Sequence, residues 1–302
     1  MRVAWTRDAP EYSPALRICT GGRGGAQAVH CTAPASFRDA RRTAAQDPAT
    51  PTLAMSAPPP SPSLVPALDA LLAGMAAAAA GGPPARLLAV SKTQPADAIA
   101  RVAAALRARP SAGPLAFGEN YVQEALEKQP ALAGLGIEWH LIGHLQSNKA
   151  KDAAAAFDWV QTVDREKLVE ALARHRAPGQ RPLNVLIQVN IDDEASKHGC
   201  RPEDVDALAD AIVARPQLAL RGLMAIPAPD PDMDRRRAAF RRMRGLFDAL
   251  AARHPGIDTL SMGMSEDFAL AIAEGATLVR VGSALFGARP PKSPTATAPE
   301  PA

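Results

Sequence analysis

Short apolar runs alternate with longer amphipathic stretches along most of this chain. Eight runs have the length and composition of buried strands: "LLAV" (87–90), "LAFGEN" (115–120), "WHLIG" (139–143), "WVQTVD" (159–164), "VLIQVN" (185–190), "ALRGLMAI" (219–226), "TLSMGM" (259–264) and "LVRVGSALFG" (278–287). The stretches between them, such as "ADAIARVAAALRAR" and "PEDVDALADAIVAR", carry apolar residues at helical spacing. A further amphipathic helix is predicted ahead of the first run, from about Leu64 to Ala80.

The alternation of strands and helices predicts parallel strands joined by right-handed crossovers. Eight such units close a (β/α)8 barrel of the TIM type, so we expect this fold in a single domain. An open, doubly wound sheet is the alternative. However, no G-x-G-x-x-G motif follows the first strand, and eight units are more than such a sheet usually needs. Both folds place the functional site at the carboxyl ends of the strands.

The two ends of the chain lack this pattern. Residues 1–54 show no sustained helical or strand period, so we expect a disordered leader, or a start that has been extended upstream of a natural one near Met55. They also lack the apolar core and cleavage site of a signal peptide. We expect the folded barrel, with its N-terminal helix, to span residues 55–288 and a disordered tail to span 289–302.

Composition excludes several classes of protein. The chain has 302 residues, 47% of them hydrophobic, which is enough for a substantial core. Its net charge is +3, and no block of Lys and Arg is interleaved with aromatic residues, so nucleic-acid binding is not expected. No apolar stretch has the length of a membrane span. The three cysteines have neither metal-binding nor disulfide spacing, which suits a reducing compartment. We expect a cytoplasmic monomer.

A lysine and two serine-containing segments follow the predicted strands at their carboxyl ends. Lys92 follows the first strand; a lone lysine there is usually a solvated loop residue. "SMGMSED" (261–267) and "VRVGSALFG" (279–287) follow the seventh and eighth strands, where such barrels commonly bind phosphate at backbone N–H groups and a helix N-terminus. Ser265 and Ser283 would add hydroxyl donors beside a helix beginning near Glu266. Alternatively, Ser265 only caps that helix and Gly282 only turns the chain.

A phosphate opposite an inward lysine fits a phosphosugar aldolase or a protein that binds pyridoxal 5′-phosphate (PLP). Arg280, two residues before Gly282, favours PLP because an arginine at this position would face the pyridine nitrogen. A guanidinium keeps its proton, so the ring nitrogen would stay unprotonated and the ring would be a weaker electron sink. The alternative for Arg280 is a buried structural ion pair with a carboxylate.

Eight segments together resemble the pyridoxal phosphate homeostasis proteins, single-domain relatives of the alanine racemase barrel. The segments are "LLAVSKTQP", "FGENYVQEAL", "WHLIGHLQSNK", "TVDREKL", "QVNIDDEASKHGC", "LRGLMAI", "LSMGMSEDFALAI" and "GATLVRVGSALFG". The resemblance extends from about residue 64 to 288 and implies an alanine-racemase-like barrel that binds PLP without established enzyme turnover. It implies that Lys92 holds the cofactor as an internal aldimine, that Asn120 lies near the ring and that Arg280 meets the ring nitrogen. It also implies a phosphate site lined by Ser261, Met262, Ser265, Gly282 and Ser283.

Two functions of different class remain open. One is a homeostasis protein that holds intracellular PLP and supplies it to apo-enzymes through transient contacts. The other is a PLP-dependent amino-acid racemase, which needs a second acid/base group opposite the lysine. Tyr12 lies in the leader, Tyr121 is expected to pack at a helix start, and too few residues follow Gly287 for a second domain. His140 reads as a core histidine and His144 as a weak candidate base, so we expect a binding protein rather than an enzyme.

The segment "HLQSNK" (144–149) is expected to form an exposed loop. It leaves open a third function, a scaffold that binds a protein partner through this loop. Nothing in its composition names such a partner.

Overall fold

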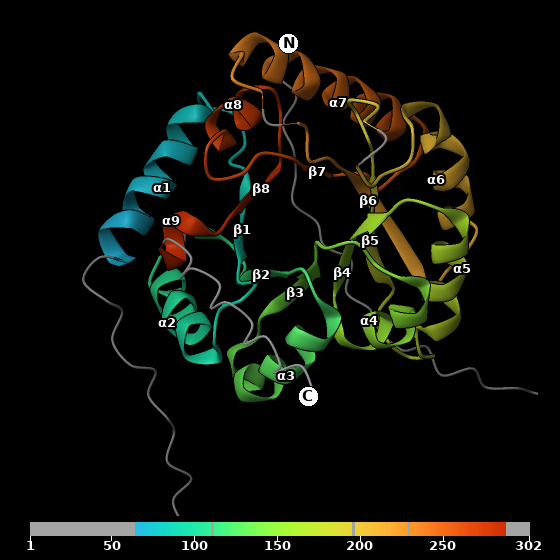
Figure 1. Cartoon of the computed structure of the whole chain (residues 1–302), viewed down its shortest axis with the longest axis horizontal. Coiled ribbons are helices and arrows are strands. Elements are labelled where there is room, and N and C mark those ends of the chain that lie inside the picture. The colour runs from blue at the N-terminus through green and yellow to red at the C-terminus, as the bar shows by residue number, and fades with distance from the viewer. Residues whose placement is uncertain (1–63, 110–111, 195–196, 229, 288–302) are drawn as a thin grey trace, which may run out of the picture. The chain divides into compact units, whose positions relative to one another are not determined.

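The computed structural model describes residues 64–109, 112–194, 197–228 and 230–287. Within these ranges Figure 1 shows a ring of strands surrounded by helices. The predicted leader (1–54) and tail (289–302) lie outside the described residues.

Eight parallel strands in the described part of the chain close into a barrel, in chain order from β1 to β8. Their bounds are β1 (Arg86–Val90), β2 (Ala116–Glu119), β3 (Glu138–Leu141), β4 (Trp159–Val163), β5 (Leu183–Gln188), β6 (Leu218–Met224), β7 (Thr259–Ser261) and β8 (Leu278–Val281). The last strand pairs with the first, with Arg86 opposite Leu278 and Ala89 opposite Val281. This closure confirms the predicted (β/α)8 fold and excludes the open sheet.

Helices follow the strands and cover the outside of the barrel (Figure 1). They are α1 (Leu64–Ala78), α2 (Ala96–Arg107), α3 (Val122–Leu132), α4 (Ala150–Ala156), α5 (Glu166–His175), α6 (Val205–Val213), α7 (Met233–Arg253), α8 (Phe268–Ala273) and α9 (Ser283–Phe286). The predicted N-terminal helix is α1, which packs beside α8 and α9. No described helix is both long and apolar enough to cross a membrane.

The two faces of each strand build separate parts of the core. In β1, Leu87 and Ala89 belong to the large cluster between the strands and the helices. Leu88 belongs to a small cluster inside the barrel, with Val90 packed against it. Because successive side chains on a strand point to opposite faces, positions 88, 90 and 92 share the inner face. The inward-facing positions of β1 therefore continue past the strand to residue 92, at the mouth of the barrel.

His140 lies fully buried in the barrel interior, as the sequence predicted for a core histidine. Its ring stacks on Trp159, with centroids 5.1 Å apart and planes 10° apart. Its Nε2 lies 2.8 Å from Glu138 Oε1, and its Nδ1 lies 2.9 Å from Gln161 Nε2. Burial lowers the pKa of His140, so the imidazole is held neutral between two hydrogen-bond partners.

Candidate functional site

A cavity of about 200 Å³ lies at the carboxyl ends of β8, β1 and β2. Six of the eight predicted site residues line it: Lys92, Asn120, Ser265, Arg280, Gly282 and Ser283. Its volume is below the roughly 300–1,000 Å³ of typical drug-sized sites, so the cavity suits a small ligand.

Lys92 lies in the cavity wall because of the alternation along β1. Val90 and Lys92 both line the cavity, two residues apart on the inner face. The Lys92 side chain is half-buried there. The backbone turns sharply at the next residue, since Thr93 has a φ of 64°. The lysine is therefore part of a built site and not of a solvated loop.

A buried hydrogen-bond network fixes the residues on both sides of Lys92. Ser91 Oγ donates to Glu119 Oε1 at 2.6 Å. Lys128 Nζ donates to the Ser91 carbonyl oxygen at 3.1 Å and to both Glu119 carboxylate oxygens at 3.1 and 3.2 Å. Glu124 accepts from Lys128 Nζ and from the Thr93 backbone N–H, each at 2.5 Å. This network holds the β1–α2 loop in place from outside the barrel.

Glu119 is the fully buried member of that network. Burial raises the pKa of its carboxyl, while the Ser91 hydrogen bond and the positive charge of Lys128 act in the opposite direction. The carboxylate depends on these two partners, because an unpaired buried charge is strongly unfavourable.

Arg280 is buried in β8, with 4% of its surface exposed, and lines the cavity. Its guanidinium donates to Ser261 Oγ at 2.7 Å and to the Ala225 carbonyl oxygen at 2.8 Å. Both acceptors are neutral, and no described carboxylate forms an ion pair with it, so the alternative of a structural ion pair is wrong. Burial lowers the pKa of Arg280 to about 10, against the opposing charge of Asp267, so the group stays charged at neutral pH.

Ser261 and Met262, predicted to line the phosphate, do not line this cavity. Ser261 Oγ accepts from Arg280 and donates to Gln161 Oε1 at 2.7 Å. Met262 is fully buried in the cluster between strands and helices. The strand alternation explains both positions, because it turns one residue inward and its neighbour outward. Ser261 therefore supports Arg280 from below, and the Met262 side chain is a core residue.

Ser265 and Ser283 face each other at the β7 and β8 side of the cavity, with their hydroxyl oxygens 3.1 Å apart. The helix expected near Glu266 begins instead at Phe268 and has six residues. A turn precedes it, closed by a 2.7 Å hydrogen bond from the Met264 backbone N–H to Asp267 Oδ1. The alternative in which Ser265 only caps this helix is therefore wrong, because the N-cap residue is Asp267. The hydroxyl pair provides donors, and Asp267 turns its carboxylate toward its own backbone.

Asn120 follows β2 and is half-buried in the cavity wall. Gly143 packs directly against its backbone, since a Cβ at 143 would lie 2.0 Å from the Asn120 carbonyl oxygen. Only glycine permits this approach, which fixes where Asn120 stands. Its neighbour Tyr121 is the N-cap residue of α3 but is 63% exposed, so the expectation that it packs at the helix start is wrong.

Comparison with known proteins gives a consistent match. The profile of the family described as "Alanine racemase, N-terminal domain" matches residues 66–290. A pyridoxal phosphate homeostasis protein from Pseudomonas aeruginosa is 54% identical over 216 residues, which are 71% of this chain and 90% of that protein. One from Escherichia coli is 50% identical over 206 residues, covering 67% of this chain and 85% of that protein. The chain belongs to the pyridoxal phosphate homeostasis protein family.

Solved structures that are similar to this chain have the same architecture. PipY from Synechococcus elongatus, without PLP, is 37% identical with a TM-score of 0.64, covering 74% of this chain and 100% of PipY. A structure of PipY with PLP bound is 38% identical with a TM-score of 0.58, covering 72% of this chain and 100% of PipY. A D-threonine aldolase from Filomicrobium marinum, 17% identical with a TM-score of 0.57 over 74% of this chain and 60% of that one, shares the fold alone.

Sequence reasoning missed several residues that line this cavity. The unpredicted lining residues are Val90, Gln94, Ile142, Ile226, Met264, Phe286 and Gly287. Strand alternation could have identified Val90 and Ile142, because both lie on or just after a strand at a position that faces the inside of the barrel. No sequence pattern identified Lys128 as part of the network beside Lys92, since an i,i+4 pair with Glu124 is equally typical of a solvated helix face.

Proposed function

We propose that this chain binds PLP in the cavity described above and serves PLP homeostasis, with Lys92 holding the cofactor as a Schiff base. The observation that carries the proposal is Arg280, a buried cation that lines the cavity and has neutral hydrogen-bond acceptors. Such a group is favoured in a site that receives an electron-rich or anionic ligand.

The remaining residues match the parts of PLP. The Lys92 amine suits its aldehyde, and the Ser265 and Ser283 hydroxyls suit its phosphate. Val90 and Ile142 give apolar walls for a flat ring. The similarity to PipY, which has a structure with PLP bound, supports the same ligand.

When bound, PLP supplies an aldehyde carbon and an electron-withdrawing ring. The Lys92 amine would hold the cofactor at that carbon. Arg280, which stays protonated at neutral pH, would donate a hydrogen bond to the ring nitrogen without giving up its proton. The residues thus favour holding the ring over using it as a strong electron sink.

We propose a carrier rather than a racemase. A two-base racemase needs a second proton donor within hydrogen-bond reach of the substrate carbon. Tyr121, which follows the cavity residue Asn120, was considered as such a donor. It lines a different hollow together with His144 and does not line the cavity that contains Lys92. The names of relatives, which are homeostasis proteins, support the same choice. We further propose that the chain is a cytoplasmic protein and that it is a monomer. Light scattering of the purified protein tests the monomeric state.

The direct test of the lysine is chemical. Protein incubated with PLP should be yellow, and borohydride reduction should leave the phosphopyridoxyl mass on the peptide that contains Lys92. Lys92→Ala should stay colourless, whereas Lys149→Ala, a matched change outside the cavity, should behave as the parent chain. Labelling of another lysine in the parent protein would overturn the assignment.

The carrier function needs a separate test. Protein loaded with PLP is mixed with an apo-enzyme that requires PLP, and recovery of that enzyme's activity is followed against free PLP. The same protein is assayed for racemisation and decarboxylation of a panel of amino acids. Turnover that Lys92→Ala abolishes would make the racemase class the better answer.

A further inference from the structure

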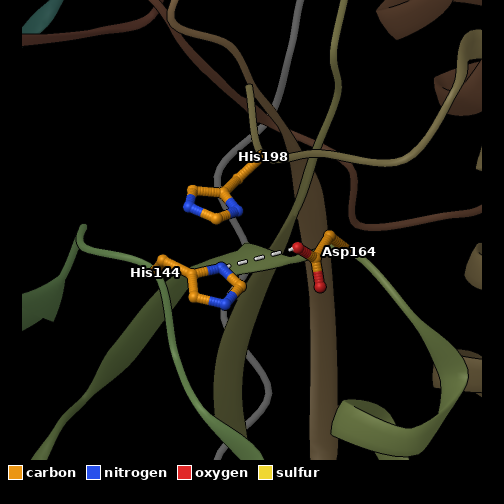
Figure 2. Close-up of side chains that lie close together, drawn as sticks. All are labelled: His144, Asp164 and His198. Carbon is orange, nitrogen blue, oxygen red and sulfur yellow. Dashed lines mark ion pairs between the residues drawn. The ribbon is translucent and has the colours of Figure 1, made fainter. Parts of the chain in front are cut away.

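Three side chains lie close together in the loops that follow β3, β4 and β5 (Figure 2), and none of them lines the lysine-containing cavity. His144, Asp164 and His198 follow these strands, and their potential ligand atoms lie within 4.8 Å of one another. His144 Nδ1 is 3.8 Å from Asp164 Oδ2. The two imidazole rings stack, with centroids 3.8 Å apart and planes 15° apart.

The cluster supplies the donor types of a transition-metal site. A neutral imidazole has a free nitrogen lone pair, which is the form that binds metal ions. The nearby Asp164 carboxylate adds an anionic oxygen of the kind that completes such a ligand set.

The backbone around the cluster is held firmly. Thr162 Oγ1 donates to the Gly143 carbonyl oxygen at 2.9 Å, directly before His144. Gln188 Nε2 donates to the His198 carbonyl oxygen at 3.1 Å. The next residue, Gly199, has a φ of 125°, and a Cβ there would lie 2.6 Å from a backbone nitrogen. These contacts therefore fix the backbone that carries the two histidines, while the imidazole side chains can still rotate.

Asp164 is also oriented by its neighbour. Arg165 pairs with Asp164 Oδ1 and donates to the Leu145 carbonyl oxygen at 2.9 Å, which leaves Asp164 Oδ2 facing His144. The Asp164 side chain is 10% exposed, so little water competes for it. The positive charge of Arg165 will weaken the binding of any cation, so we expect a site of moderate affinity.

We propose that His144, Asp164 and His198 bind a divalent transition-metal ion, with Zn²⁺ the best-suited probe. Two imidazoles and one carboxylate suit zinc and its neighbours, whereas Mg²⁺ and Ca²⁺ prefer oxygen ligands throughout. Zinc binds such ligands at about 2.0–2.2 Å, so the three groups must draw together by roughly 1 Å. The two histidines are exposed and have room to rotate. A fourth position would remain for water.

The test is calorimetric titration of Zn²⁺ into the full-length, tag-free chain, with Co²⁺ absorption as a second readout of the ligand set. One ion should bind per chain. His144→Ala, His198→Ala and Asp164→Asn should each weaken binding at least tenfold, while His175→Ala, an exposed histidine in α5, should not. Thermal melts of each variant without metal check that it is folded, and Zn²⁺ should raise the melting temperature of the parent chain and of His175→Ala more than that of the three ligand variants.

Three further variants separate this site from other sources of affinity and from the proposed PLP function. A His30→Ala, Cys31→Ser double variant and Cys200→Ser should keep the Zn²⁺ affinity, since neither change replaces one of the three proposed ligands. Lys92→Ala should also keep it, so the outcome does not depend on the proposed PLP function. Binding that persists in His144→Ala, or that disappears only with the cysteines, would overturn the proposal.

Discussion

Lys128 and Arg280 are both buried cations close to the same lysine, yet their surroundings differ completely. Lys128 donates to oxygens of two carboxylates, Glu119 and Glu124. Arg280 donates to a hydroxyl and a carbonyl oxygen, and it lines the cavity. Removing a charge from water is unfavourable by several kcal/mol per ion, and an opposite charge offsets much of it. A cation that is already neutralised belongs to the scaffold, whereas one left with neutral partners beside a cavity is suited to bind a ligand.

The largest expected effect is on Lys128. Replacing it in Lys128→Met leaves the Glu119 carboxylate buried without its countercharge, so the free energy of unfolding at pH 7 should fall by about 3–5 kcal/mol. Urea unfolding of the protein without cofactor measures it, with Lys151→Met on the exposed face of α4 as control.

The pH dependence of this loss gives a second check. The pKa of Glu119 is raised in the folded protein, so its burial is least unfavourable at low pH, and the stability is lost as pH rises through the folded pKa. The deficit of Lys128→Met should therefore be smaller at pH 5 than at pH 7. An equal deficit at both values would mean that Glu119 is not the group left unpaired.

The next effect concerns the hydroxyl pair. Ser265→Ala with Ser283→Ala removes two donors from the proposed phosphate site, and hydrogen bonds to a charged group contribute about 1.5–3 kcal/mol each. PLP affinity should fall by roughly one hundredfold or more, measured by absorption titration. Melting temperatures without cofactor should be nearly unchanged, because Ser283 is exposed and Ser265 half-buried. A variant that binds PLP like the parent would place the phosphate elsewhere.

Arg280→Gln should have a smaller effect on affinity and a distinct effect on the spectrum. Glutamine keeps a hydrogen-bond donor but removes the buried charge, so the absorption of bound PLP should shift while most binding persists. Arg221→Gln, which loses a pair with Asp258 at the other end of the barrel, is the control and should leave the spectrum unchanged. If Arg280→Gln abolishes binding as fully as the double serine variant, the arginine grips the phosphate and not the ring.

The smallest effect is expected below Arg280, where His140 contacts Gln161 and Gln161 contacts Ser261. The pKa of His140 is lowered by burial, so the unfolded chain binds a proton at pH values where the folded chain does not. Stability should therefore fall as pH drops below about 6.5, by at most about 1.4 kcal/mol per pH unit for this group. His140→Gln should flatten that slope between pH 7 and 5.5, and exposed His175→Gln should not. Equal slopes in all three proteins would contradict the assignment.

The barrel and most of the cavity could be predicted because their signals are local. Each strand is a short apolar run, and the residue that follows it in phase, as Lys92 follows Val90, reaches the mouth. The predictions were wrong where a single residue decides at which residue a helix begins, or which face of a strand a side chain is on. The Asp267 side chain closes a turn and delays α8, and alternation turns Ser261 and Met262 to opposite faces.

Other features depend on contacts between distant segments, which periodicity does not encode. Lys128 looks like any helix-surface lysine until α3 packs its side chain against Glu119. His144, Asp164 and His198 come from three separate loops, so no motif spacing announces them. The resemblance to a family implied roles for most of the cavity residues, but it implied none for these three, although they lie in the resembling segments.

Thr93 gives the loop beside Lys92 a bearing on protein engineering. A β-branched residue with a φ of 64° is strained by about 1–3 kcal/mol. Thr93→Gly should therefore raise the thermal stability, because glycine relieves the backbone strain at that position. The same change would give the lysine-bearing loop more freedom in the folded state and increase the entropy lost when cofactor is bound. Thr93→Gly should thus raise the thermal stability of the protein and lower its affinity for the cofactor.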